Sequence, residues 1–275
     1  SIIFAAYHYI TAGTGVPIDY WHMGTHMAGV MLLVFIGFPA IRGAKYQEIR
    51  SNTWWRYGNV PVWDWLFIVL GISAAYYVGI TWYEIDFELL GFRFQLPEQV
   101  LRQGNPAQID VVFGTILIVV LLEAVRRTLG PIVPIIIIIF IIYAVFGMQM
   151  PLQILKHPGV SWDLFINSMY FPEEGIFGVT LWIVSTVVFH FVLFGIIAQR
   201  MGLGQFFVDV ATVFAGRYTG GLAKVSVVSS AFFGTISGSS IANTVSTGSL
   251  TIPNMKRMGY PGHLAGGVEA AASAG

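Results

Sequence analysis

The stretch of residues 225–255, VSVVSSAFFGTISGSSIANTVSTGSLTIPNM, decides the class of fold to which the chain belongs. It contains no charged residue, yet twelve of its 31 residues are Ser or Thr, and these are densest at residues 237–244. A single membrane crossing would place that polar centre in the middle of the bilayer, where unsatisfied backbone groups cost several kcal/mol each. The stretch is therefore apolar enough to enter a membrane but lacks the pattern of an ordinary span. Pro253 is expected to end it.

A break in the Ser/Gly run would explain how an apolar stretch can have a polar centre. Each half would then have about 12–14 residues, which is too short to cross a hydrocarbon core of about 30 Å. Lys224 precedes the stretch and Lys256 follows it, so both ends are expected on the same side of the membrane. We predict a re-entrant helical hairpin over about residues 222–255 that enters from the cytoplasm. The alternative is a packing surface of small residues, which Gly234 and Gly238 would satisfy on their own.

The hairpin has the composition of an ion site. Broken helices are tolerated at membrane depth where they line an aqueous cavity, and their freed carbonyls can bind a cation or their N-termini an anion. The stretch offers Ser, Thr and Asn oxygens and no His, Cys or acid, which favours sodium and predicts no transition-metal site. The predicted cation-binding residues are Ser237, Gly238, Ser240, Asn243, Thr244, Ser273 and Gly275. The predicted substrate-binding residues are Ser239, Thr247 and Glu269.

Glu269 is the acid closest in sequence to this hairpin on its C-terminal side, in a small-residue helix expected over residues 265–275. Acids inside a membrane are costly, so their default interpretation is functional. Glu269 is interpreted as a proton carrier or as part of a substrate-side network. The alternative is an acid at the start of a helix near the interface.

The rest of the chain supports a membrane protein. Only 28 of its 275 residues (10%) are charged, 56% are hydrophobic, and the mean hydropathy is +0.72. A soluble globule could not hide so much apolar surface. We predict an all-α polytopic membrane protein with about five to six transmembrane helices. The expected spans are residues 21–41, 62–83, 109–126, 131–148 and 176–200. Residues 158–174 and 204–218 are expected to form interfacial amphipathic helices, or else connecting helices packed on the bundle.

The basic residues predict the orientation of the spans. Eleven of the 14 Lys and Arg residues fall on one side, and only Arg93, Arg102 and Lys156 fall on the other. By the positive-inside rule, residues 42–61 and 256–257 are cytoplasmic and residues 84–107 are periplasmic.

Composition also excludes several classes of function. Zero net charge without a basic stripe excludes a nucleic-acid partner, and the absence of cysteine excludes disulfides and thiol chemistry. No phosphate-binding P-loop motif is present, and nothing in the chain predicts an enzyme. Residues 1–11 have the pattern of the tail of a spanning helix, and the chain ends inside an Ala/Gly/Ser segment. We therefore expect a piece of a longer protein.

Particular motifs resemble a known family. FGTISGSSIANT (233–244) and TIPNMKRMGY (251–260) resemble the first hairpin of the large membrane subunit of tripartite ATP-independent periplasmic (TRAP) transporters. LLEAVRR (121–127) and PEEGIFG (172–178) resemble fused permeases that work with TAXI-type binding proteins. Many dicarboxylate relatives carry Asp at the position of Asn243. In having Asn there, this chain is similar to the TAXI-associated branch. The resemblance implies that only the N-terminal part of a permease is present. It divides the chain into a small-subunit-like scaffold (1–127) and the truncated start of a large-subunit-like domain (128–275).

The same resemblance implies a function. The family members are secondary transporters with an elevator mechanism in the bacterial or archaeal cytoplasmic membrane. A periplasmic binding protein delivers an organic anion, and an ion gradient drives import, with Na⁺ as the expected coupling ion and H⁺ as an alternative. No other cofactor is expected. Two alternatives remain, a channel-like protein and a membrane redox protein whose haem is held by His8, His22, His26 and His190. Packing is the preferred interpretation of His22 and His26.

Overall fold

The computed structural model describes residues 2–16, 19–38, 40, 56–57, 60–89, 92–171, 175–237 and 240–274. The chain forms two compact units, Ser1–Ser185 and Thr186–Gly275, which are described separately below. This division by compactness does not test the boundary expected at residues 127/128, so that boundary stays a prediction.

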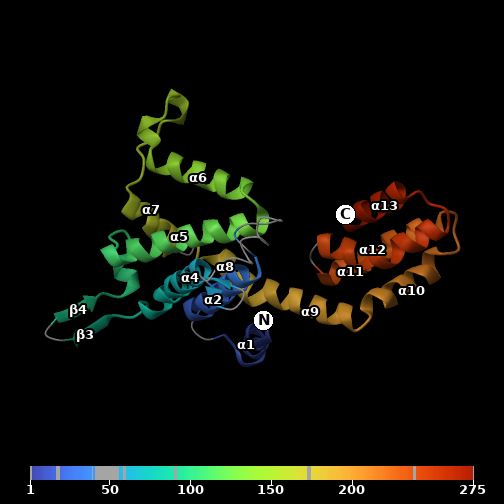
Figure 1. The fold of residues 1–275 in the computed structure, drawn as a ribbon, viewed down its shortest axis with the longest axis horizontal. Coiled ribbons are helices and arrows are strands. Elements are labelled where there is room, and N and C mark those ends of the chain that lie inside the picture. Colours follow the sequence, from blue (N-terminus) through green and yellow to red (C-terminus); the bar gives the residue numbers. More distant parts are fainter. Residues whose placement is uncertain are drawn as a thin grey trace. The chain divides into compact units, whose positions relative to one another are not determined.

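The described part of the first unit is built mainly from helices (Figure 1). Its helices are α1 (Ile2–Thr14), α2 (Asp19–Gly37), α4 (Val62–Ile80), α5 (Gln108–Leu129), α6 (Ile132–Val145), α7 (Trp162–Tyr170) and α8 (Val179–Ile183). Helix α2 packs along α4, and α5 packs against α4, α6 and α7. The core between them contains fully buried apolar side chains, among them Met31, Phe35, Leu117, Ile166 and Tyr170.

A buried ion pair fixes the loop before α5. Arg102, which is 3% exposed, is paired with the fully buried Asp110. Arg102 also donates to the carbonyl oxygens of Pro97 (2.9 Å) and Thr81 (3.2 Å), and Tyr77 donates to Asp110 (2.6 Å). Since both charges have several partners, their burial is compatible with a stable loop.

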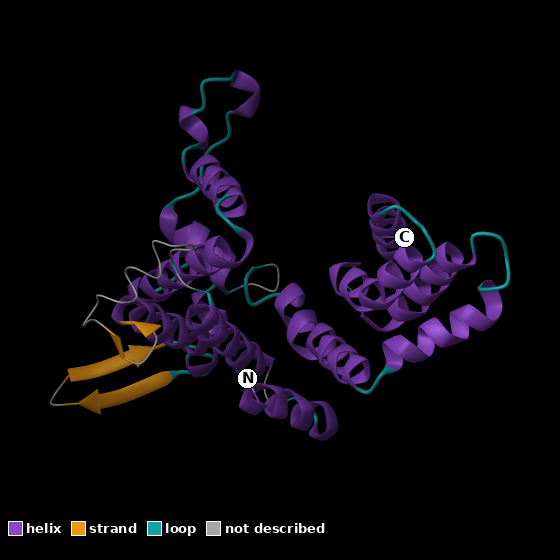
Figure 2. Ribbon diagram, turned by 45° about the vertical axis from the view of Figure 1, so that its right-hand side comes forward, coloured by secondary structure: helices purple, strands orange, loops and turns teal. Residues whose placement is uncertain are grey.

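Residues 85–89 and 92–96 form two paired strands in a segment for which the sequence predicts no strand. Strands β3 (Ile85–Leu89) and β4 (Phe92–Leu96) pair antiparallel and are the two long orange arrows in Figure 2. In this register Ile85 lies opposite Leu96. Two shorter strands, β1 (Arg56–Tyr57) and β2 (Val60–Pro61), also pair. The alternation of apolar and polar residues in IDFEL and FRFQL has the period of two that a strand requires. On the polar side, the Arg93 guanidinium holds the pKa of Asp86 below its usual value through a hydrogen bond to its carboxylate.

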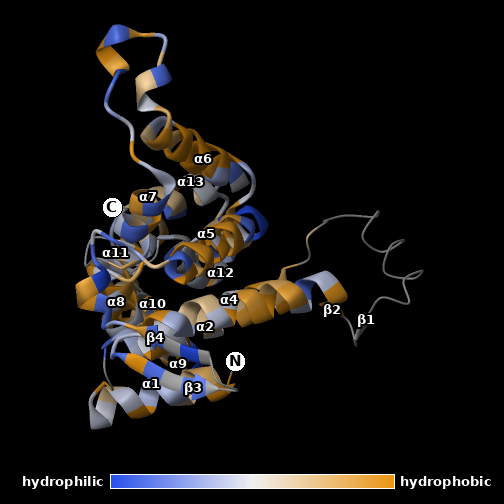
Figure 3. Cartoon of the chain, turned by 90° about the vertical axis from the view of Figure 1, so that its left-hand side faces the viewer, coloured by the Kyte–Doolittle hydropathy of each residue, from blue (hydrophilic) through white to orange (hydrophobic). Residues whose placement is uncertain are grey.

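The helices agree with the expected all-α membrane protein. Three of them are long and apolar enough to cross a membrane, namely Val62–Ile80, Gln108–Leu129 and the continuous helical stretch Val179–Arg200. They match the spans expected at 62–83, 109–126 and 176–200. Helix α6 lies in the fourth expected span and is almost wholly hydrophobic (Figure 3). Its 14 residues extend about 21 Å, however, which is less than the bilayer core. The first expected span coincides with α2, which is less apolar, so five to six spans stay a prediction.

The second unit contains α9 (Phe189–Arg200), α10 (Leu203–Ala215), α11 (Gly221–Ser237), α12 (Ser240–Arg257) and α13 (Gly262–Ala274). A π-helical segment, Val184–Val188, leads into α9. Helices α11, α12 and α13 lie side by side (Figure 1). Helices α7 and α10 fall in the two expected amphipathic segments, and their position at a membrane interface stays a prediction.

Residues 225–255 lie in two helices, α11 and α12, that pack against each other, and residues 238–239 between them lie outside the described residues. Two details differ from the prediction. The halves are 17 and 18 residues long because both helices continue through the flanking charged residues, which favour helix formation. Pro253 lies inside α12 and does not end it. The helix ends at Arg257, and Gly259 follows with a φ of 93°, so that the amide of Tyr260 bonds the carbonyl of Met255 (3.1 Å). Entry of this hairpin into a membrane stays a prediction.

Candidate functional site

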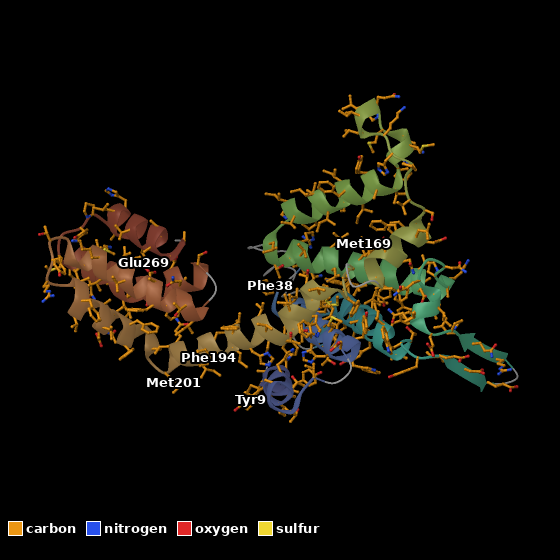
Figure 4. The ribbon with its side chains drawn as sticks, turned by 180° about the vertical axis from the view of Figure 1, so that it is seen from behind. Tyr9, Phe38, Met169, Phe194, Met201 and Glu269 are labelled. Atoms are coloured by element: carbon orange, nitrogen blue, oxygen red, sulfur yellow. The ribbon has the colours of Figure 1, made fainter. Side chains whose placement is uncertain are left out.

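Glu269 lies at the centre of a polar cluster in the second unit. It occupies the middle of α13 and is fully buried, so it is not at the start of a helix. In Figure 4 its label marks the region where the three C-terminal helices lie together. Gly248 on α12 permits the close approach, because a Cβ at this position would lie 3.0 Å from Cγ of Glu269.

Five hydroxyl groups surround the carboxyl group of Glu269. Ser226 of α11 and Thr251 of α12 donate to Oε2, both at 2.5 Å. Thr247 of α12 donates to Oε1, which also accepts longer bonds from Ser230 (3.3 Å) and Ser273 (3.5 Å). All five hydroxyl-bearing residues are buried, so these bonds form in a poorly solvated environment where they are strong.

Asn243 extends this cluster toward the break between α11 and α12. Its Nδ2 donates to the backbone carbonyl of Ser230 at 2.9 Å. Asn243 Oδ1 lies 3.1 Å from Ser230 Oγ and is an alternative acceptor, beside Glu269 Oε1, for the single Ser230 hydroxyl proton. Ser230 Oγ also lies 2.9 Å from Ser273 Oγ. Asn243 and Ser273 are therefore connected through one serine.

The cluster carries an acid without a basic partner. Among the residues that the structure describes, no Lys, Arg or His pairs with Glu269, and the five ion pairs found all lie in the first unit. A buried carboxylate with no counter-charge is costly, because hydroxyl groups replace only part of the lost hydration. The site is therefore suited to take up a positive charge, either a hard cation or a proton.

The hydroxyl groups can accommodate such a charge. Thr247 Oγ1 is also 2.8 Å from the carbonyl of Asn243, and Thr251 Oγ1 is 3.0 Å from the carbonyl of Thr247. Each hydroxyl has one proton and two lone pairs. If the hydroxyl protons of Thr247 and Thr251 point to these backbone carbonyls, the two hydroxyl oxygens present lone pairs to a cation beside Glu269.

The structure brings four of the predicted site residues together: Asn243, Thr247, Glu269 and Ser273. It does not bring Ser240 and Thr244 into the cluster. Ser240 is exposed, and the Thr244 hydroxyl bonds the Ser240 carbonyl at 2.9 Å. Gly238, Ser239, Gly275 and the side chain of Ser237 lie outside the described residues. The cation and substrate roles of all ten residues stay predictions.

Three residues of the cluster, Ser226, Ser230 and Thr251, were not among the predicted site residues. Ser226 and Ser230 are four residues apart, as are Thr247 and Thr251, so each pair shares one face of its helix. This four-residue spacing is the sequence feature that indicates a shared polar face on each helix.

The histidines of α1 and α2 are packed and hydrogen-bonded. His8, His22 and His26 are buried. His22 Nδ1 bonds Tyr7 (3.1 Å) and its Nε2 bonds the Ser185 carbonyl (3.2 Å). His8 Nε2 bonds His26 Nδ1 at 2.9 Å. These contacts support the packing interpretation, because protein groups engage both ring nitrogens of His22 and Nδ1 of His26.

Relatives with known names match short parts of the chain. A sialic acid TRAP transporter permease protein of Haemophilus influenzae is 30% identical over 124 residues, which covers 41% of this chain and 20% of that protein. The C4-dicarboxylate TRAP transporter large permease protein DctM of Rhodobacter capsulatus and the 2,3-diketo-L-gulonate TRAP transporter large permease protein YiaN of Escherichia coli are each 35% identical over 78 residues. Those matches cover 28% of this chain and 18% of either relative, so the chain spans about a fifth of the length of these proteins. No solved structure matches the chain.

The family comparison covers more of the chain than the individual relatives do. The family described as the tripartite ATP-independent periplasmic transporter, DctM component, matches residues 116–275. The matched segment includes all three helices that surround Glu269. The chain therefore belongs to the DctM component family of tripartite ATP-independent periplasmic transporters.

Proposed function

We propose that this chain is part of the membrane permease of an ion-coupled secondary transporter that imports organic anions. The named relatives are permeases for C4-dicarboxylates, sialic acid and 2,3-diketo-L-gulonate, all of which are carboxylic acids. A periplasmic substrate-binding protein would deliver the anion to a multi-pass protein of the bacterial or archaeal cytoplasmic membrane. The TAXI type of binding protein is part of the proposal and rests on Asn243 and the two upstream motifs.

The observation that carries the proposal is the buried Glu269 within its hydroxyl ring. A symporter needs a site that is stabilised by taking up its coupling ion, and a buried carboxylate without a counter-charge has this property. Hydroxyl and amide oxygens with one carboxylate form a ligand set for Na⁺. The proposed cation ligands are Ser237, Gly238, Ser240, Asn243, Thr244, Ser273 and Gly275. Ser239, Thr247 and Glu269 would bind the substrate or couple it to the ion.

The proposal assigns different roles to the two parts of the chain. Residues 1–127 would remain fixed as a scaffold, and the part beginning at residue 128 would move with the bound substrate in an elevator mechanism. The division is supported by the location of the polar cluster, since all of its described members lie on α11, α12 and α13.

The test uses the full-length permease with its binding protein in liposomes. Uptake of a radiolabelled carboxylate is measured under a sodium gradient alone and under a pH gradient alone. Asn243→Ala should raise the sodium concentration for half-maximal uptake about five- to thirtyfold, because one ligand or its support is worth about 1–2 kcal/mol. Ser249→Ala is the matched control, since among the described residues its hydroxyl, on the same helix, bonds the Ser246 carbonyl (2.8 Å) and no member of the cluster, so it should behave as wild type.

Two outcomes would contradict parts of the proposal. Uptake that needs only a pH gradient and is abolished by Glu269→Gln would replace sodium by the proton as the coupling ion. Flux that neither saturates nor needs a binding protein would indicate a channel and overturn the secondary-transport proposal.

A further inference from the structure

A second site in the same unit has different chemistry. A cavity of about 670 Å³ lies between α10, α11 and α13. Most of its lining is aliphatic or aromatic, contributed by Phe214, Ala215, Ala223, Val227, Val228 and Val268. Phe214 and Val227 remain 64% and 49% exposed, so the cavity opens to the surroundings of the unit. An apolar cavity with an opening is suited to a hydrocarbon chain.

The polar end of this cavity is positively charged. Lys224 and Tyr218 complete the lining, and Lys224 Nζ lies 5.4 Å from the centre of the Tyr218 ring. Arg217 Cζ lies at the same distance, 5.4 Å, from that ring. In the described part of the chain, neither cation forms an ion pair. Two positive charges therefore converge on one aromatic ring without a carboxylate to offset their repulsion.

The backbone adds to this positive potential. Helix α11 begins at Gly221, between the two cations in sequence, and the N-terminal end of a helix carries a partial positive charge. The positive-inside rule places Arg217 and Lys224 at the cytoplasmic surface, where anionic lipid headgroups are found.

We propose that this cavity binds one anionic phospholipid, with an acyl chain along the apolar lining and the phosphate between Arg217 and Lys224. A free anion would use only the two cations and leave the apolar lining empty. A zwitterionic lipid would use the lining but would bring its own positive charge to Arg217 and Lys224. An anionic lipid matches both halves of the site.

The test measures lipid binding to the purified, delipidated full-length permease in detergent. Native mass spectrometry compares 1-palmitoyl-2-oleoyl-phosphatidylglycerol with the phosphatidylethanolamine of the same chains, and inorganic phosphate is added as a competitor. We expect phosphatidylglycerol to bind at least tenfold more tightly than phosphatidylethanolamine, and millimolar phosphate to leave its occupancy unchanged. This comparison needs no variant, so it is independent of any folding defect.

Two variants then locate the bound lipid. The double substitution Arg217→Gln/Lys224→Gln should weaken phosphatidylglycerol binding at least tenfold and abolish the preference over phosphatidylethanolamine. Lys256→Gln/Arg257→Gln removes two exposed charges of the same unit that do not line the cavity, and it should change the affinity less than twofold. Equal binding of the two lipids to wild type would overturn the proposal. So would displacement by phosphate, or equal effects of the two double variants.

Discussion

Replacing Glu269 by glutamine should abolish the stabilisation of the protein by sodium. The substitution keeps the shape of the side chain but removes its negative charge and turns one acceptor oxygen into a donor. In the absence of sodium, the wild-type carboxylate is buried without a counter-charge, so the variant should be at least as stable as wild type. With sodium, wild type should become the more stable protein.

The contacts of Glu269 set the size of the two effects. Oε2 accepts two bonds at 2.5 Å, from Ser226 and Thr251, and bonds to a charged acceptor are worth about 1.5–3 kcal/mol each. In the glutamine variant the Thr251 hydroxyl can turn to the Thr247 carbonyl at 3.0 Å, so the variant loses about one such bond. The removal of an unpaired buried charge offsets this loss. Bound sodium at about 100 times its dissociation constant should add about 2.7 kcal/mol to the stability of wild type, and nothing to the variant.

The assay is thermal unfolding of the purified full-length protein in detergent, in NaCl and in choline chloride of equal ionic strength. Ser249→Ala should keep the wild-type response to sodium. A variant that is less stable than wild type by about 3 kcal/mol in both salts would refute the reasoning, because the hydroxyl ring would then be a structural network around a permanent charge. An equal sodium response of variant and wild type would refute it as well.

Three further predictions concern other parts of the chain. Single cysteines at Gln47 and Glu98 should react with a membrane-impermeant maleimide from opposite sides of the membrane, and labelling from one side would refute the predicted orientation. Arg102→Met should destabilise the protein by about 3–5 kcal/mol, because it leaves a buried carboxylate unpaired, whereas Arg93→Met in the exposed hairpin should cost less than about 1 kcal/mol; thermal unfolding compares the two. Gly248→Ala places a methyl group 3.0 Å from Cγ of the buried acid and should reduce the sodium-dependent gain in stability at least by half, as measured by the same unfolding assay.

The sequence was sufficient to predict the helices that are long and uniformly apolar. Helices α4 and α5 begin within one residue of the predicted starts at 62 and 109, because each contains a long charge-free run, residues 65–80 and 111–122, that has few alternatives in a membrane. The β3–β4 hairpin does not follow from the sequence, because two isolated five-residue strands are marginally stable and a short alternation of apolar and polar residues is weak evidence for a strand.

The partners of the buried acid could be predicted only in part. The composition of the hairpin indicated hydroxyl groups near Glu269, and the spacing of Thr247 and Thr251 places both on one face of α12. Which hydroxyls contact the acid depends on how α13 packs back against α11, and Ser226 and Glu269 are 43 residues apart. Local sequence patterns carry no information about how α13 packs against α11. The exclusion of Thr244 is likewise decided by its bond to the Ser240 carbonyl.

The hydroxyl ring has a consequence for synthesis of the protein. The bonds between Asn243 and Ser230 join α11 to α12, so they can form as soon as both helices have left the ribosome. Ser226 and Thr251, however, direct their hydroxyls to a carboxyl group on α13. Until that helix arrives, the hairpin exposes groups that lipid cannot satisfy. If the predicted entry of the hairpin into the membrane holds, we expect α11 and α12 to insert together with α13 and not ahead of it.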